Sequence, residues 1–167
     1  MADEADPEAG AAVTRHEVSR VIPADPATIF AVVSSPRGHV AIDASGMLQD
    51  WTGEPATAVG DEFIVHMDRE ALGDLPMGKY DVTVTITRYE QDRLITWEVS
   101  GPGFPSIGHY SGYRLEPNDD GTTTVTSIYD WDGVSDDLKP YWPVVPLSAL
   151  KATLGILERT VRQANVT

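Results

Sequence analysis

The C-terminal third of the chain constrains the fold most strongly. Residues 109–131 alternate in polarity on both sides of the turn sequence Asn118-Asp119-Asp120-Gly121, which is the pattern of a β-hairpin. Residues 146–161 carry apolar side chains at spacings of three and four, which predicts one amphipathic helix. Gly155 lies inside that helix at a cost of about 1 kcal/mol relative to alanine, so a close contact is expected there. A sheet followed by one long helix buries the apolar stripe of the helix against a sheet face, often with a cavity between them.

The rest of the sequence supplies further strands and two short helices. Residues 79–90 form the clearest strand, because Tyr80 and Val82 begin an apolar series that alternates with polar residues. Asp25-Pro26 and Ser35-Pro36 are each typical of a helix start, with a capping side chain before a proline. The predicted fold class is α+β, a curved antiparallel sheet of about six to seven strands wrapped around a long C-terminal helix, with two short helices after the first strand. The other expected strands are residues 14–22, 47–52, 62–68, 93–100, 109–117 and 122–131.

Length and composition indicate one globular domain preceded by a short tail. The sequence has 167 residues, of which 41% are hydrophobic and 23% charged, and it contains no internal repeat or linker. Residues 1–12 carry four acidic side chains and no apolar periodicity, so we expect a disordered acidic tail. Residues 13–167 are expected to form a single domain.

The charge of the chain argues against two classes of partner. It has 26 acidic and 12 basic residues, a formal net charge of −14. Nucleic acids and anionic membranes bind clustered lysines and arginines, whereas the basic residues here are scattered. Because the sequence has no cysteine, disulfides and thiolate metal sites are excluded. Since no apolar leader or spanning segment is visible, we expect a cytoplasmic protein that does not insert into membranes.

Four sequence segments at turns and at junctions between expected strands and helices resemble those of a known superfamily. They are residues 22–30 (IPADPATIF), 59–63 (VGDEF), 88–94 (RYEQDRL) and 115–125 (LEPNDDGTTTV). Over about residues 14–163 the sequence resembles the START-like superfamily, also called Bet v 1-like, SRPBCC or helix-grip, and within it the bacterial polyketide cyclase/dehydrase-like and lipid-transport-like proteins. The resemblance implies a START-like ligand-binding domain. It does not determine an activity, because the superfamily contains hydrophobic-ligand carriers, cyclases, oxygenase domains and co-chaperone-like modules.

A cavity in such a fold would be lined by alternate residues of each strand and by the inward stripe of the terminal helix. The residues so placed are mostly apolar or aromatic, with a few hydroxyls and one imidazole, a composition typical of small-molecule pockets. The alternative is that these side chains pack on one another without a cavity. Val84 and Leu147 are expected to adjoin the site, with Lys151 at its edge. The candidate ligand-binding residues are Phe63, Val65, Met67, Tyr80, Val82, Trp97, His109, Ser111, Tyr113, Ser127, Tyr129, Trp131, Leu150 and Leu154.

His109 is the candidate for proton transfer. An imidazole titrates near neutral pH, and the hydroxyls of Ser111, Tyr113 and Tyr129 are expected nearby. The alternative is a histidine that is hydrogen-bonded at the rim of the pocket. His66 is expected to point outward. The four histidines are dispersed, and the sequence has no Gly-x-Ser-x-Gly, phosphate-loop or dinucleotide motif, so neither a metal ion nor a cofactor is expected.

Three functions stay open from the sequence. The first is binding of a hydrophobic or aromatic small molecule, lipid- or polyketide-like, in the cavity. The second is an enzyme of the polyketide cyclase or aromatase type that uses His109 and other polar pocket residues. The third is a protein-interaction module with an acidic outer face and no ligand, although no particular protein partner is indicated. The sequence does not separate a carrier from an enzyme.

Overall fold

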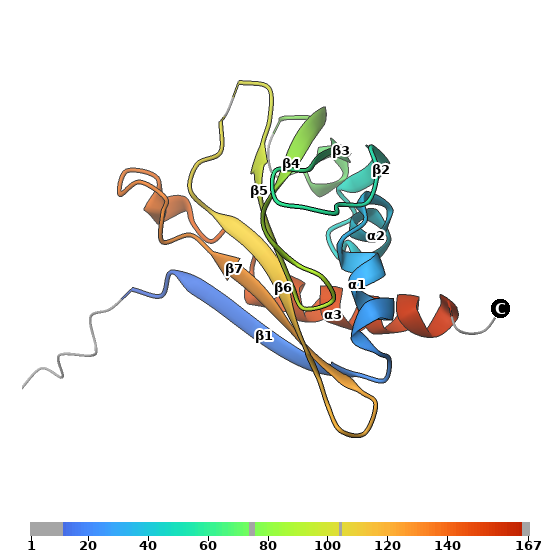
Figure 1. Ribbon diagram of the computed structural model, residues 1–167. Helices are drawn as coiled ribbons and strands as arrows, with labels where there is room; N and C mark the ends of the chain where they lie inside the picture. The colour runs from blue at the N-terminus through green and yellow to red at the C-terminus, as the bar shows by residue number, and fades with distance from the viewer. Residues whose placement is uncertain (1–11, 74–75, 104, 165–167) are drawn as a thin grey trace, which may run out of the picture.

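Seven antiparallel strands form a single sheet, and three α-helices pack with it (Figure 1). The computed structural model describes residues 12–73, 76–103 and 105–164. The strand order is β1-β7-β6-β5-β4-β3-β2, so that β1 and β2 are the edges. The strands are β1 Arg15–Ile22, β2 Leu48–Thr52, β3 Glu62–Asp68, β4 Lys79–Glu90, β5 Leu94–Ser100, β6 Tyr110–Pro117 and β7 Thr123–Asp130. The helices are α1 Pro26–Val33, α2 Pro36–Ile42 and α3 Leu147–Ala164, with 3-10 turns η1 Glu70–Leu72 and η2 Lys139–Tyr141.

This arrangement confirms the predicted helix-grip α+β fold. The expected strands and helices are present with ends that differ by at most three residues, the largest difference being the extension of α3 to Ala164. In Figure 1, α3 passes behind the sheet near β6 and β7, and it packs against β1, β7, α1 and α2. Of the helices in the described ranges, none combines the length and apolar character needed to cross a membrane. The predicted tail, residues 1–12, lies outside the described residues except for its last position.

The two short helices begin as their sequences predict. The carboxylate of Asp25 caps α1 by accepting a hydrogen bond of 2.7 Å from the backbone N–H of Thr28. A proline then occupies the first turn of each helix, where its missing N–H costs no helical hydrogen bond. A Cβ on Gly38 would lie 1.8 Å from the carbonyl oxygen of Val32, so only glycine permits α2 to approach α1 this closely.

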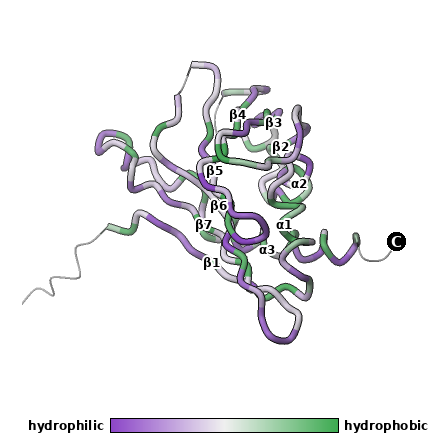
Figure 2. Tube along the Cα trace, viewed as in Figure 1, coloured by the Kyte–Doolittle hydropathy of each residue, from purple (hydrophilic) through white to green (hydrophobic). Residues whose placement is uncertain are grey.

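The main core lies between the concave face of the sheet, α1 and α3. Figure 2 shows apolar residues gathered where the helices meet the sheet, while the tip of the β6–β7 hairpin is hydrophilic. The apolar stripe expected on α3 is buried and consists of Leu150, Leu154, Leu157 and Val161. Burial of each of these side chains stabilises the fold by about 1.5–3 kcal/mol. Leu147 was expected to join this stripe, but it is 38% exposed because the packed clusters begin only at Leu150.

A β-bulge in β4 changes which side chains face the core. The pairing with β5 shifts between Ile86 and Arg88. A strict period of two from Tyr80 would place Tyr89 on the outer face. Tyr89 instead packs against the core, with its ring 5.5 Å from that of Phe30 and nearly perpendicular to it.

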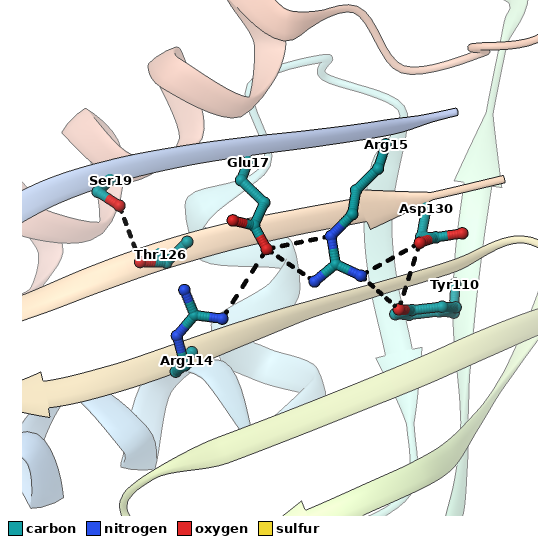
Figure 3. Close-up of polar contacts among 7 residues, drawn as sticks. All are labelled: Arg15, Glu17, Ser19, Tyr110, Arg114, Thr126 and Asp130. Atoms are coloured by element: carbon teal, nitrogen blue, oxygen red, sulfur yellow. Dashed lines mark hydrogen bonds and ion pairs between the residues drawn. The ribbon is translucent and has the colours of Figure 1, made fainter. Parts of the chain in front are cut away.

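Charged side chains cover the outer face of β1, β7 and β6 (Figure 3). Glu17 accepts hydrogen bonds from Arg15, the shortest being 2.7 Å, and lies 3.8 Å from Arg114. Arg15 also reaches Asp130 at 3.2 Å and the hydroxyl of Tyr110 at 2.9 Å. The outer face is therefore a hydrated polar surface. Each exposed ion pair of this kind contributes little to the stability of the protein.

Candidate ligand site beside helix α3

A small cavity lies where α2, the sheet and α3 meet, and its volume is about 130 Å³. We call it the Thr153 cavity, after the only α3 residue that lines it in the described structure. Its other lining residues are Leu48, Trp97 and Tyr113 from the sheet, His39 and Ile42 from α2, and Asp43 directly after α2.

Two of the predicted ligand-binding residues, Trp97 and Tyr113, come together in this cavity. The contribution of α2 was not predicted, because strand alternation identifies only residues of the sheet. A signal was present in the sequence: His39 and Asp43 are four residues apart, so they lie on the same face of a helix. Their common face borders the cavity.

Aromatic rings form one wall of the Thr153 cavity. The ring of Trp97 lies 5.8 Å from that of Tyr113 and 4.6 Å from that of His39. His39 also meets Phe63 edge to face at 5.2 Å. Tilted and edge-to-face contacts of this kind are the favoured arrangements of packed aromatic rings.

His39 is a buried, neutral part of this wall. Its Nε2 lies 2.8 Å from the carbonyl oxygen of Val33, and because a carbonyl can only accept, Nε2 donates. Burial lowers the pKa of His39 to about 4, and the hydrogen bond to Val33 opposes this shift only in part. His39 is therefore uncharged at neutral pH.

Tyr113 brings a polar group to the cavity. Its side chain is 6% exposed, and its hydroxyl has no hydrogen-bond partner among the described residues but is accessible to water; in the described ranges Nε1 of Trp142 is the only buried side-chain polar atom without a partner. Burial, and secondarily the charge of Asp43, raise the pKa of Tyr113, so that it stays a neutral donor. The carboxylate of Asp43 is itself occupied, since it accepts hydrogen bonds from Ser45 at 2.7 Å and from the backbone of Leu48 at 3.1 Å.

Most other predicted lining residues lie away from this cavity. Phe63, Val65 and Leu154 belong to the packed core, as does Val84. Val82 and Ser127 are buried, and Ser111 is half-buried. Met67 and Tyr80 border a separate hollow at the ends of β3 and β4. Tyr129, Trp131 and Leu150 form a second apolar cluster with Val134.

His109 lies in contact with this second cluster and does not line the Thr153 cavity. Its Nδ1 is 2.9 Å from the hydroxyl of Tyr129, and its ring meets that of Trp142 edge to face at 5.4 Å. Burial lowers the pKa of His109, partly offset by the charge of Glu98, and burial raises the pKa of Tyr129 to about 12. Of the polar residues expected beside His109, the structure brings only Tyr129 within hydrogen-bonding distance.

Two larger hollows lie at the rim of the sheet. One, of about 560 Å³, is lined by charged residues that include Asp25, Arg93 and Arg114. The other, of about 710 Å³, is bordered by His66 and Asp81, and His66 points outward as expected, 37% exposed, with Nδ1 2.7 Å from Asp81. No group of three or more His, Asp or Glu side chains in the described ranges could hold a metal ion.

The comparisons with known proteins agree with the fold. Residues 13–162 match the family described as polyketide cyclase / dehydrase and lipid transport. The chain belongs to this family. Among curated proteins, none matches its sequence.

Solved structures share the fold of this family member at low sequence identity. Protein Ms6760 from Mycobacterium smegmatis has a TM-score of 0.66 at 12% identity, with 90% of this chain and 92% of that chain covered. Truncated norcoclaurine synthase from Thalictrum flavum has a TM-score of 0.61 at 14% identity, with coverages of 88% and 92%. The Aha1 dimer from Colwellia psychrerythraea has a TM-score of 0.58 at 16% identity, with 89% of this chain and 96% of that chain covered. At identities of 12–16% the likeness extends to the fold alone.

Proposed function

We propose that the chain binds a small hydrophobic or aromatic molecule in the Thr153 cavity and holds one polar atom of it through Tyr113. The observation that carries the proposal is the hydroxyl of Tyr113, which has no partner among the described residues, beside an aromatic wall. A ligand that offers an acceptor replaces water at this hydroxyl and gains the burial of its apolar surface.

The size of the cavity limits what enters it. The cavity is partly open to solvent, and its volume of about 130 Å³ limits the size of the guest. Cavities of about 150 Å³ accept a benzene ring. A single ring, or the end of a longer polyketide- or lipid-like molecule, therefore fits the cavity as it stands.

The protonation states of His39 and Tyr113 favour a binding function over proton-transfer catalysis. A general acid or base works best when its pKa lies near the working pH. In the Thr153 cavity the pKa of His39 is about 4 and that of Tyr113 is raised, so both hold their protonation state at neutral pH. His109, the sequence candidate for a cyclase-type reaction, does not border the cavity.

The test uses two probes of similar size, acetophenone, which has a carbonyl acceptor, and ethylbenzene, which has none. Both are titrated into the ¹⁵N-labelled protein and followed by NMR chemical shifts. We expect both probes to bind. Tyr113→Phe should weaken the binding of acetophenone by about fivefold and leave the affinity for ethylbenzene unchanged. Tyr141→Phe is the matched control, because that tyrosine is 74% exposed. Absence of binding by both probes, or equal weakening of both by Tyr113→Phe, would overturn the proposal.

A further inference from the structure

Three polar side chains form a hydrogen-bonded chain across strands β2, β3 and β4. The hydroxyl of Thr52 lies 2.8 Å from Nε2 of His66, and Nδ1 of His66 lies 2.7 Å from a carboxylate oxygen of Asp81. We call these three residues the Thr52 triad. None of them lines the Thr153 cavity, so the triad is separate from the site of the proposed function.

The pairing of the three strands brings the triad together on the outer face of the sheet. His66 lies directly opposite Asp81 on β4 and opposite Asp50 on β2. Thr52 follows Asp50 by two residues, so it lies on the same face, diagonally across from His66 and within reach of its ring. Val65, the neighbour of His66 in the alternation, is buried in the core, which places the triad on the opposite, solvent-facing side.

The two hydrogen bonds determine the direction in which a proton can move. An ionised carboxylate only accepts hydrogen bonds, so Nδ1 of His66 donates to Asp81. In the neutral imidazole, Nε2 then carries the free lone pair and accepts the hydrogen bond from the hydroxyl of Thr52. A hydroxyl bonded to a base that a third group orients is the arrangement of an activated nucleophile.

A backbone donor adjoins the hydroxyl of Thr52. The N–H of Gly53, the next residue, has no hydrogen-bond partner among the described residues. Because β2 is an edge strand, no further strand of the sheet can use this group. The N–H of the residue after a nucleophile is a common donor to the oxyanion of acyl transfer. This N–H is therefore available to the oxygen that becomes negative when Thr52 attacks a carbonyl.

Space for the rest of a substrate begins at His66. Thr52 is exposed, so a carbonyl can approach it from the solvent. The hollow of about 710 Å³ at the ends of β3 and β4 is lined by His66, and beyond it by Met67 and Tyr80. Thr52 lies opposite Ile64, so the hollow extends past His66 in the direction away from Thr52. A leaving group can therefore lie across His66, with its apolar surface against Met67 and Tyr80.

We propose that Thr52 is the nucleophile of an acyl-transfer site whose acyl donors are esters of phenols. Oγ1 of Thr52 attacks the carbonyl carbon while Nε2 of His66 takes the hydroxyl proton. The bond between that carbon and the phenol oxygen then breaks, the acyl group stays on Thr52 as an ester, and His66 returns the proton to the departing phenolate. Asp81 is a positioning residue, because it holds the tautomer of His66 in which Nε2 can accept.

The first experiment treats the folded protein with 4-nitrophenyl acetate and locates the acetyl group by peptide mass spectrometry. We expect acetylation of Thr52 and a fast phase of 4-nitrophenolate release, which His66→Gln slows by at least about tenfold. Thr52→Val should remove the fast phase. Thr85→Val is the matched control, because Thr85 lies on the same face but donates to Glu62, at 3.2 Å, instead of to a histidine. Acetylation confined to lysines, or an unchanged fast phase in Thr52→Val, would mean that the triad is a surface hydrogen-bond network only.

A second experiment tests the positioning role of Asp81. Asp81→Ala removes the acceptor of Nδ1, so acetylation of Thr52 should slow by about tenfold. The ¹⁵N chemical shifts of the His66 ring at about pH 8 should show protonated Nδ1 in the parent protein and protonated Nε2 in the variant. Asp50→Ala is the control, because it removes the same charge from the other side of His66, where the carboxylate accepts from the backbone of Trp51. Equal slowing by both variants, or protonated Nε2 in the parent protein, would overturn the proposal.

Discussion

The rings of Trp97 and Tyr113 lie 5.8 Å apart on neighbouring strands, with their planes inclined by 38°. Opposite them α3 presents Thr153, which stands one position before the buried Leu154 and off the apolar stripe. The cavity therefore exists because two large aromatic side chains of the sheet meet a small side chain of the helix.

Thr153→Leu is expected to close this cavity. The larger side chain fills empty volume and buries additional apolar surface, so the free energy of unfolding should rise by about 1–2 kcal/mol in urea titrations. Acetophenone binding should be lost. Thr153→Ala is the control, because it improves helix propensity without filling the space. A lower stability for Thr153→Leu would mean that the cavity is too narrow to accept a ring.

Removing the hydroxyl of Tyr113 and removing that of Tyr129 should change the free energy of unfolding by different amounts. Tyr113→Phe deletes a hydroxyl that has no partner among the described residues and is accessible to water, so the free energy of unfolding should change by less than about 0.5 kcal/mol. Tyr129→Phe breaks the 2.9 Å hydrogen bond to His109 and should lower it by about 1 kcal/mol. Equal losses in both variants, measured by urea denaturation, would indicate a structural partner for Tyr113.

The sequence was sufficient to predict the fold and two of the residues that line the Thr153 cavity. Trp97 and Tyr113 were assigned to the concave face because the strand period of two follows from backbone geometry alone. The same reasoning could not tell which aromatic residues border empty space. Tyr129 does not, because the segment after β7 returns and packs Trp142 against its cluster, a long-range contact with no local signature. The bulge that redirects Tyr89 was likewise invisible in the alternation.

His39 should make stability depend on pH. Its pKa is about 4 in the folded protein, below the ordinary value of 6.5, so between these values the unfolded chain binds more protons. The contribution to stability is complete above pH 6.5 and falls by roughly 3 kcal/mol as the pH decreases to 4. In His39→Gln, whose amide can still donate to Val33, urea titrations from pH 4 to 8 should give a flatter profile. Parallel profiles for the two proteins would contradict the buried neutral state.

Substitution of two glycines by alanine should have opposite effects. In Gly155→Ala the new methyl meets nothing nearer than Arg20 at 4.0 Å, so the gain in helix propensity should raise the free energy of unfolding by about 0.5–1 kcal/mol. For a domain of this size, that corresponds to an increase in Tm of about 1–4 °C, measurable by calorimetry. In Gly38→Ala the methyl would lie 1.8 Å from the carbonyl oxygen of Val32, so α1 and α2 must separate and Tm should fall. If Gly155→Ala also lowers Tm, the surface of α3 beside Arg20 is more closely packed than the 4.0 Å separation indicates.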